Sequence, residues 1–121
     1  MLVIDAANVI GSRPDGWWRD RPAAARRFVD RVRGAVEDGR LEPPVVVVVE
    51  GASRRGVTAG EDGGVRVLHA PAGGDDLLVS VTAEADEPVT LVTADRALRA
   101  RVEELGAGVS GPSWLLDILG E

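Results

Sequence analysis

Five consecutive valines, Val45–Val49, place the strongest constraint on what this chain can fold into. Valine branches at Cβ and favours the extended backbone of a strand. A strand with one face in water alternates apolar and polar residues, and this run shows no alternation. Strands of this kind are typical of parallel sheets that are covered by helices on both faces. The run therefore predicts a central strand of an α/β protein.

Strand and helix patterns alternate along the rest of the chain. Strands are predicted at 2–5, 65–69 and 89–93, with an edge strand at 107–109. Helices are predicted at 22–38, 75–85, from about 95 to 106, and at 111–120, although the β-branched residues of 75–85 also fit a strand. Loops rich in turn residues are expected at 13–22 and 51–64. This order predicts one domain, residues 1–121, with a three-layer α/β/α architecture and a central, mostly parallel sheet of four to five strands.

Composition indicates where the protein is located more clearly than it indicates what the protein binds. The chain has no cysteine, so neither disulfides nor thiolate metal sites are expected. It has no apolar run long enough to cross a membrane, and its start lacks the features of a signal peptide, which predicts a cytoplasmic protein. The net charge of −6 argues against a nucleic-acid ligand, yet all 14 basic residues are arginines, which suit phosphate. Genomic base composition also explains a lysine-free sequence. The charge therefore decides little about whether the protein binds nucleic acid.

Carboxylates follow the predicted strands at similar positions. Asp5 ends the first strand, and Glu50 directly follows the valine run. The loop after the third strand leads to Asp75 and Asp76, and Asp95 lies two residues beyond the fourth strand. The carboxyl ends of parallel strands meet at one edge of a sheet, where open α/β sheets bind ligands. We therefore expect these acids to lie together.

Grouped carboxylates repel one another unless a cation neutralises them. Two unit charges about 4 Å apart repel by roughly 4 kcal/mol at an effective dielectric constant of 20. Oxygen ligands suit Mg²⁺ or Mn²⁺, which can activate water for the hydrolysis of phosphoesters. Each acid also has a structural explanation, since Asp75 and Asp95 stand where helix N-caps are expected and Glu50 ends a strand. One shared site for one or two ions accounts for all of them.

Four segments, in order along most of the chain, carry a family resemblance: VIDAANVIGS, VVVVEG, GGDDLLV and VTADRALRARVEELGA. The first is specific because a strand ends in Asp with Asn three residues on, and the last because T-x-D-R-x-L opens a helix. In these segments the chain resembles the NYN-domain family, in its YacP-like branch, of the PIN-like nuclease superfamily. The resemblance implies a PIN-like α/β/α fold and metal-dependent cleavage of RNA phosphodiester bonds.

The resemblance also implies roles for individual residues. Three acids match the metal ligands of the family: Asp5, Asp75 and Asp95. Glu50 stands where relatives usually carry an acid, often Asp, and Asn8 matches a polar residue that would orient Asp5 or a water molecule. Asp76 stands where relatives often have a second acid, which would support the metal ligands. Arg96 would contact a substrate phosphate, although a surface ion pair also explains this residue.

Aromatic and basic side chains near the predicted edge are candidates for RNA contacts. Trp17 and Trp18 would stack on unpaired bases, at roughly 1–3 kcal/mol for each stack, or would form an apolar plug beside the first long helix. Four arginines would follow a phosphate backbone or remain solvated: Arg13, Arg19, Arg54 and Arg55. His69 could carry a proton, although packing at a strand end also explains it. Trp114 is expected in the core.

The sequence thus predicts a metal-dependent endoribonuclease with RNA as its partner, and with it the ribosome or other translation machinery. One alternative is a non-catalytic RNA- or ribosome-binding module of the same fold. Another is a phosphatase or nucleotide hydrolase. A haloacid-dehalogenase-type phosphatase would need D-x-D after the first strand, where this chain has DAAN, and a receiver domain would need a lysine. A P-loop enzyme would need G-x-x-x-x-G-K-[ST], which is absent from the sequence.

Overall fold

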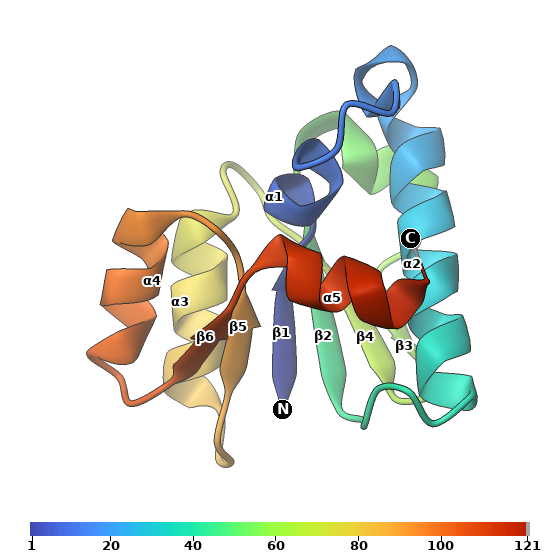
Figure 1. The fold of residues 1–121 in the computed structure, drawn as a ribbon. Coiled ribbons are helices and arrows are strands. Elements are labelled where there is room, and N and C mark those ends of the chain that lie inside the picture. Colours follow the sequence, from blue (N-terminus) through green and yellow to red (C-terminus); the bar gives the residue numbers. More distant parts are fainter. Residues whose placement is uncertain (121) are drawn as a thin grey trace.

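A computed structural model describes residues 1–120 and shows one six-stranded sheet between two layers of helices (Figure 1). The strands are β1 (Leu2–Asp5), β2 (Val45–Val49), β3 (Gly60–Asp62), β4 (Val65–His69), β5 (Thr90–Val92) and β6 (Gly108–Ser110). Their order across the sheet is β3-β4-β2-β1-β5-β6. All neighbours pair in parallel except β3, which runs antiparallel to β4 at one edge.

Helices cover both faces of this sheet, which confirms the predicted three-layer fold. They are α1 (Ala6–Gly11), α2 (Arg21–Glu37), α3 (Asp75–Glu84), α4 (Arg96–Glu103) and α5 (Pro112–Leu119). Helices α1, α2 and α5 cover one face, and α3 and α4 cover the other (Figure 1). None of these helices within residues 1–120 has the length and apolar character that crossing a membrane requires.

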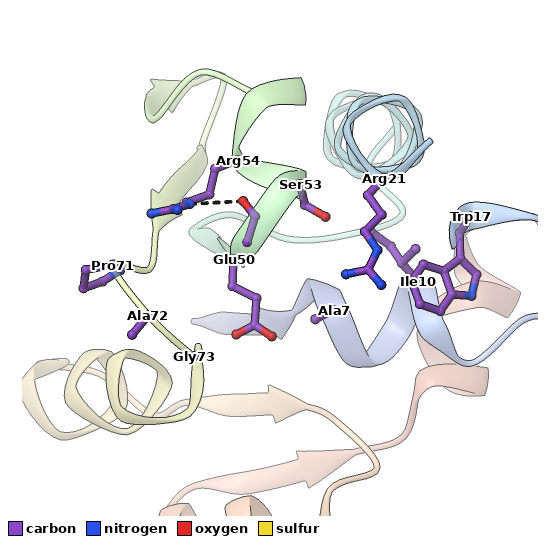
Figure 2. Close-up of a pocket in the computed structure, with 11 residues that line it drawn as sticks. Ala7, Ile10, Trp17, Arg21, Glu50, Ser53, Arg54, Pro71, Ala72 and Gly73 are labelled. Carbon is purple, nitrogen blue, oxygen red and sulfur yellow. Dashed lines mark hydrogen bonds between the residues drawn. The ribbon is translucent and has the colours of Figure 1, made fainter. Parts of the chain in front are cut away.

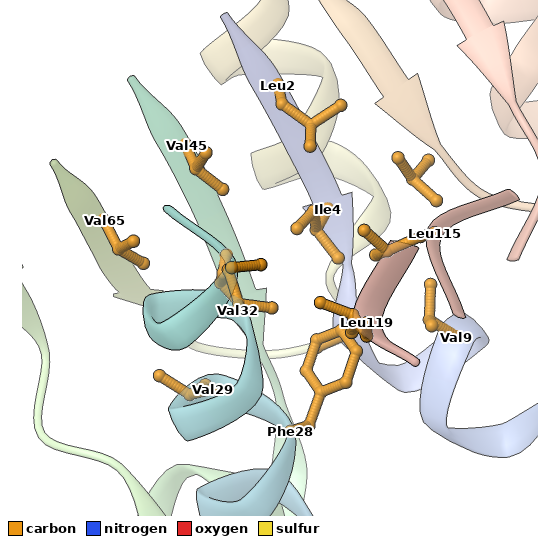
Figure 3. Packing of buried hydrophobic residues seen from close by; sticks show 14 of the residues in the cluster. Leu2, Ile4, Val9, Phe28, Val29, Val32, Val45, Val65, Leu115 and Leu119 are labelled. Carbon is orange, nitrogen blue, oxygen red and sulfur yellow. The ribbon is translucent and has the colours of Figure 1, made fainter. Parts of the chain in front are cut away.

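The valine run forms β2 and is buried on both faces, as predicted. Val45, Val47 and Val49 face the layer that contains α2 and α5, whereas Val46 and Val48 face α3 and α4. Phe28 of α2 and Leu115 of α5 pack on the first of these faces, beside apolar side chains of β1 and β4 (Figure 3). The five valines are at most 4% exposed. Alternation is absent from the sequence because neither face of this strand meets water.

Short elements account for the differences from the prediction. The sheet has six strands rather than four to five, and the segment 51–64, expected to be a loop, contains the 3-10 helix η2 (Gly51–Gly56) and strand β3. Strand β3 is exposed along its whole length, so it shows no apolar pattern. Helix α1 was not predicted, because six residues are too few to reveal a 3.6-residue period.

Local hydrogen bonds set the start of α2 and support the helical conformation of α3. In the predicted loop 13–22, a 3-10 helix, η1 (Trp17–Arg19), precedes Asp20, whose Oδ1 accepts a hydrogen bond from the Ala23 N–H at 3.1 Å. This cap starts α2 at Arg21. The ambiguous segment near residue 80 is helix α3, and the hydroxyl of its buried Thr82 donates to the Leu78 carbonyl at 2.9 Å.

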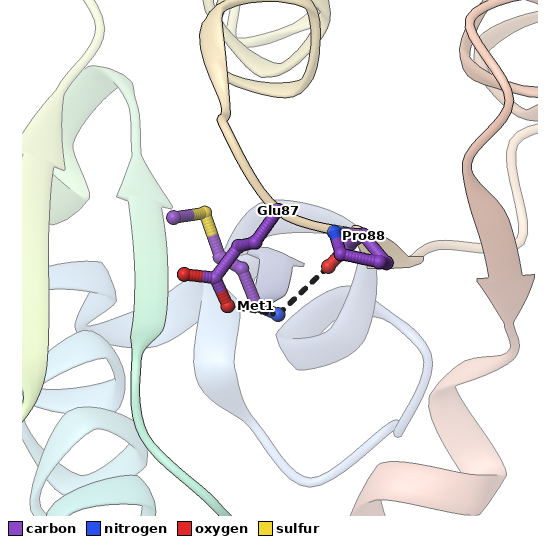
Figure 4. Close-up of polar contacts among 3 residues, drawn as sticks. All are labelled: Met1, Glu87 and Pro88. Atoms are coloured by element: carbon purple, nitrogen blue, oxygen red, sulfur yellow. Dashed lines mark hydrogen bonds and ion pairs between the residues drawn. The ribbon is translucent and has the colours of Figure 1, made fainter.

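Parallel pairing brings the carboxyl ends of β1, β2, β4 and β5 to one edge of the sheet. At the opposite edge, the Met1 ammonium group donates to Glu87 Oε1 at 3.0 Å and to the Pro88 carbonyl at 2.8 Å (Figure 4). These contacts tie the start of β1 to the segment that enters β5. Ile4 pairs with Val92, so the residues that follow them, Asp5 at the end of β1 and Thr93 directly after β5, lie side by side.

Candidate active site

Asp5 is a buried carboxylate at the carboxyl edge of the sheet, with only 9% of its surface exposed. Its Oδ1 accepts a hydrogen bond from the Asn8 N–H at 3.3 Å, and its Oδ2 accepts one from the Thr93 hydroxyl at 2.9 Å. Burial raises the pKa of Asp5 to about 6; the two hydrogen bonds oppose this rise, and the charges of Glu50 and Asp75 add to it. A bound cation would stabilise the ionised form of such a group.

Glu50 and Asp75 bring two further carboxylates toward Asp5 from other parts of the chain. Glu50 directly follows β2 and is half-buried, and its Oε2 accepts a hydrogen bond from the Gly74 N–H. Asp75 is the first residue of α3 and is exposed. Both charges act on Asp5. We refer to Asp5, Glu50 and Asp75 as the acid group, which contains three of the four acids predicted to bind metal.

Asp95 caps a helix next to the acid group. Its Oδ1 accepts a hydrogen bond from the Leu98 N–H at 3.0 Å, at the start of α4. Its own N–H donates to the Thr93 hydroxyl oxygen at 3.2 Å, and this hydroxyl donates to Asp5. Asp95 is not among the charges that shift the pKa of Asp5. Asp95 is therefore linked to the acid group through Thr93.

Thr93 and Asn8 hold the loop after β5 against α1. Thr93 is fully buried, and the side-chain oxygen of Asn8 accepts a hydrogen bond from the Ala94 N–H at 2.8 Å. Asn8 was expected to orient Asp5; its backbone N–H contacts that carboxylate, while its side chain positions the loop. Sequence analysis did not single out Thr93, although the T-x-D pattern places a hydroxyl two residues before Asp95.

Asp76 and Arg96, the two supporting residues that the family resemblance implies, are exposed. Asp76 forms an ion pair with Arg101 of α4, with 3.0 Å between Oδ1 and Nη2. This contact turns Asp76 toward α4, although it was expected to support the metal ligands. Arg96 is the first residue of α4, and its contact with a phosphate stays a prediction.

A cavity of about 500 Å³ lies beside Glu50, and we call it the side cavity (Figure 2). Its walls include Trp17, Arg21 and Glu50, together with Ser53, Arg54 and Gly73. These residues come from three separate parts of the chain: the segment from η1 to the start of α2, the segment that follows β2, and the loop between β4 and α3. The cavity therefore exists only in the folded protein.

Two arginines of the side cavity are held in place by neutral groups. The guanidinium carbon of Arg21 lies 5.3 Å from the centre of the Trp17 ring. Arg54 donates from Nε to the Gly51 carbonyl and from Nη1 to the Ala70 carbonyl, both at 3.1 Å. Arg54 was predicted to contact RNA and Arg21 was not. An arginine four residues after a tryptophan was the signal that could have identified Arg21.

Trp18 and Arg19 form a similar pair outside the side cavity. The guanidinium carbon of Arg19 lies 5.9 Å from the centre of the Trp18 ring, and the Trp18 side chain is exposed. Of the two tryptophans predicted to stack on bases, only Trp17 lines this cavity. Arg13 lines a separate small hollow, whose walls also include Trp17.

The remaining candidates do not line the side cavity. Arg55 and His69 line a separate, open depression that they share with Arg54. The Nε2 atom of His69 makes a hydrogen bond of 2.6 Å with the Val57 carbonyl. Trp114 is 43% exposed, so its predicted place in the core is wrong. It stands on the outer surface of α5, whose buried positions are filled by Pro112 and three leucines.

The donor atoms of the acid group can be compared with the requirements of a divalent cation. Within residues 1–120, no three Asp, Glu or His side chains lie close enough together to form a ready-made metal site. Carboxylate oxygens are nevertheless the ligands that Mg²⁺ and Mn²⁺ prefer. Mg²⁺ usually keeps several waters and takes only one or two protein carboxylates. The buried Asp5, with Glu50 and Asp75 near enough to influence its charge, fits such an ion.

Gly74 allows the Glu50 carboxylate to approach the loop before α3. A Cβ atom at this position would lie 2.7 Å from Glu50 Oε2, so Gly74→Ala must displace that carboxylate. Because only the end of a flexible side chain has to move, we expect the free energy of unfolding to change by less than about 1 kcal/mol. For a Mn²⁺ site formed by the acid group, the affinity measured by calorimetric titration should fall about 10- to 100-fold. In the control variant Gly73→Ala, a Cβ would meet nothing within 4 Å, and the affinity for Mn²⁺ should stay unchanged. An equal loss of affinity in both variants would contradict a role for Glu50 in binding the metal.

The fold and its acidic edge define a class: three-layer α/β/α proteins with a mostly parallel sheet and carboxylates at the strand ends. Within that class, the structure is similar to the crystal structure of a mutant of Rae1 (YacP) from Bacillus subtilis, with a TM-score of 0.70. The match covers 98% of this chain and 73% of the Rae1 chain, at 19% sequence identity. No family model and no curated protein matches the sequence. The comparison establishes a YacP-like fold, and membership of the NYN-domain family stays a prediction.

Proposed function

We propose that this protein is a metal-dependent endoribonuclease of the NYN-domain type. The observation that carries the proposal is Asp5, a carboxylate buried at the ligand-binding edge of the sheet with Glu50 and Asp75 acting on it. Burying a carboxylate without a counter-charge destabilises a fold. A bound cation would supply the counter-charge, which would explain why Asp5 is buried beside Glu50 and Asp75.

The acid group would hold one or two Mg²⁺ or Mn²⁺ ions, with Asp95 as a further ligand in the predicted set. Such an ion, when bound, activates water and neutralises charge on a phosphate. The protein itself supplies the positions of the carboxylates. Thr93 and the Asn8 N–H fix both oxygens of Asp5, and the Gly74 N–H fixes one oxygen of Glu50. Fixed oxygens bind a cation without the entropy cost of ordering them.

RNA is the proposed substrate because the side cavity combines an aromatic ring with arginines beside the acid group. Tryptophan offers a stacking surface for bases, and guanidinium groups bind phosphate. A ribosome-bound RNA is one form that this substrate would take. No protein nucleophile is required, since the reaction uses water.

A non-catalytic RNA- or ribosome-binding module of the same fold is the second candidate. The observation that favours it is the cap on α4, because Asp95 already uses one oxygen to accept the Leu98 N–H. In that case the acids would serve the structure of the edge, and the side cavity would bind RNA without turnover. A phosphatase or nucleotide hydrolase would use the same carboxylates on a smaller phosphoester.

The adjacent residues Asp75 and Asp76 provide a matched test of the proposed site. Both are exposed in the first turn of α3, but only Asp75 acts on Asp5, whereas Asp76 pairs with Arg101. We expect Asp75→Asn to reduce Mn²⁺-dependent cleavage of a mixed single-stranded RNA pool by at least about 100-fold, since loss of supporting partners alone costs about 10- to 100-fold. Asp76→Asn should retain cleavage within about twofold, because an exposed ion pair contributes little.

Metal-dependent thermal stabilisation is measured on the same samples. Stabilisation of the wild type by Mn²⁺ without cleavage would favour the binding module or a smaller phosphoester substrate. Equal cleavage by wild type and Asp75→Asn would remove Asp75 from the site.

A further inference from the structure

We propose that the side cavity binds one unpaired nucleotide of an RNA strand, with its base against Trp17 and its phosphate between Arg21 and Arg54. The inference rests on the proposed function, because the acid group would act on the same strand. It adds a subsite that selects single-stranded RNA and sets the position of the cleaved bond.

The volume of the side cavity suits a single nucleotide. About 500 Å³ lies within the range of roughly 300–1,000 Å³ that is usual for small-ligand sites. Three of the lining residues, Ala7, Ala72 and Gly73, are small and leave room between the larger side chains of the walls (Figure 2). Unpaired bases can turn out of a strand into such a cavity, whereas the bases of a duplex stay stacked on their neighbours. The site therefore favours single-stranded RNA.

Trp17 presents a stacking surface that is already ordered. Its ring meets the Trp18 ring edge to face, with 5.8 Å between centroids and 88° between planes. The Arg21 guanidinium group lies over the same ring, so an entering base would stack on this guanidinium plane or displace it from the indole. Side chains that are held before binding lose less entropy when a ligand arrives. Indole rings and guanidinium planes are both groups on which proteins stack RNA bases.

Arg21 and Arg54 supply positive charge that no carboxylate of residues 1–120 neutralises through an ion pair. Arg54 uses Nε and Nη1 on backbone carbonyls, which leaves its Nη2 atom for a ligand. Two guanidinium groups thus share the cavity with the single carboxylate of Glu50. On a protein with a net charge of −6, this is a local positive site, and guanidinium groups bind phosphate well.

Glu50 connects the side cavity to the acid group. Its carboxylate lines the cavity and also acts on Asp5. A nucleotide in the cavity therefore has its neighbouring phosphodiester beside the carboxylates that would hold the metal. The same arrangement makes Arg21 and Trp17 positioning residues for the cleaved bond.

The pair Trp18 and Arg19 is a built-in control for Trp17 and Arg21. Both pairs consist of an arginine over a tryptophan, at 5.9 Å and 5.3 Å. Only the second pair lines the side cavity. If aromatic and basic residues affect RNA affinity in general, substitutions in both pairs should weaken binding. If the side cavity is a nucleotide subsite, only substitutions of Trp17 and Arg21 should weaken it.

The test measures binding of the four 5′-nucleoside monophosphates without divalent metal, so that cleavage does not contribute. In a Trp18→Phe/Trp114→Phe protein, Trp17 is the remaining tryptophan, and the two replaced side chains are 47% and 43% exposed. We expect at least one nucleotide to quench Trp17 fluorescence on binding. Calorimetry is then carried out on single arginine variants that keep all three tryptophans. Nucleotide affinity should be at least about tenfold weaker in Arg21→Ala and should change by less than about twofold in Arg19→Ala.

Trp17→Leu should weaken nucleotide binding in the same assay, by roughly 5- to 150-fold if a base stacks on the ring. Arg21→Ala keeps the test valid if Trp17→Leu fails to fold, because Arg21 is exposed. Equal losses for Arg19→Ala and Arg21→Ala, or inorganic phosphate binding as tightly as every nucleotide, would overturn the subsite. Cleavage of RNA without nucleotide binding would overturn the subsite alone, whereas specific binding without cleavage would overturn the proposed nuclease alone.

Discussion

Asp5→Asn is expected to abolish RNA cleavage and at the same time to stabilise the metal-free protein at neutral pH. The carboxylate has an ordinary pKa of 3.8, and burial raises this pKa to about 6 in the folded protein. A rise of this size means that ionising Asp5 costs the folded state about 3 kcal/mol, since one pKa unit corresponds to about 1.4 kcal/mol. Asparagine has nearly the same shape and carries no charge, so it removes this cost.

The sign of the pH dependence of the free energy of unfolding follows from the difference in the pKa of Asp5 between the folded and unfolded states. Below pH 3.8 Asp5 is protonated in both the folded and unfolded states, so its ionisation costs nothing. Between pH 3.8 and about 6 the unfolded chain releases the proton first, and the wild type loses stability as the pH rises. Above pH 6 the full cost remains. Urea unfolding should therefore show Asp5→Asn more stable than wild type by about 1–3 kcal/mol at pH 8, with little difference near pH 3.5.

Adding Mn²⁺ provides the control that links this stability difference to the site. The ion should stabilise the wild type at pH 8 and narrow the difference, because it needs the ionised carboxylate. Cleavage by the wild type should decline at acid pH, with a midpoint below the metal-free pKa of about 6, because the proton competes with the ion for Asp5. If Asp5→Asn were instead the less stable protein at pH 8, the hydrogen bonds from Thr93 and Asn8 would outweigh the cost of burial, and a cation would not be needed.

Gly56→Ala is expected to be the most destabilising of the glycine substitutions considered. A Cβ atom at Gly56 would overlap the Pro22 carbonyl oxygen and lie 2.8 Å from the Pro22 Cα. These are backbone atoms at the start of α2, so no side chain can turn away to make room. The 3-10 helix η2 would have to separate from α2. Overpacking of this kind typically costs about 1–3 kcal/mol or more, and urea unfolding measures it.

A glycine inside α2 provides the matched control. A Cβ atom at Gly34 would meet nothing within 4 Å, and alanine forms helices better than glycine, so Gly34→Ala should stabilise the protein by about 0.5–1 kcal/mol. Gly56→Ala should also weaken nucleotide binding, because Arg54 and Arg21 stand on the two elements that Gly56 brings together. Unchanged stability in Gly56→Ala would show that η2 does not pack on α2 as described.

Much of the fold could be predicted because long elements carry periodic patterns. The uninterrupted valines of β2 identified a doubly covered strand, and the repeats of α2 and α4 identified helices within a few residues. The short helix α1 and the exposed strand β3 carry no such pattern. Their places depend on a cap from Asp5 and on pairing with β4, which are contacts and not periodicities.

For the candidate site, the sequence alone determined which acids end at the sheet edge, because parallel strands with helical connections leave no other place for Asp5, Glu50 and Asp75. Tertiary structure decided which partners the acidic side chains contact. It gave Asp5 a bond to Thr93, 88 residues away in sequence, and turned Asp76 toward Arg101.

The side cavity also arose only in the tertiary structure, from Trp17, Arg21 and Arg54 on separate elements. The position of the acids at the sheet edge follows from the order of strands and helices, and local sequence patterns encode that order. The partner of a side chain follows from packing between distant segments, and no local pattern records that packing.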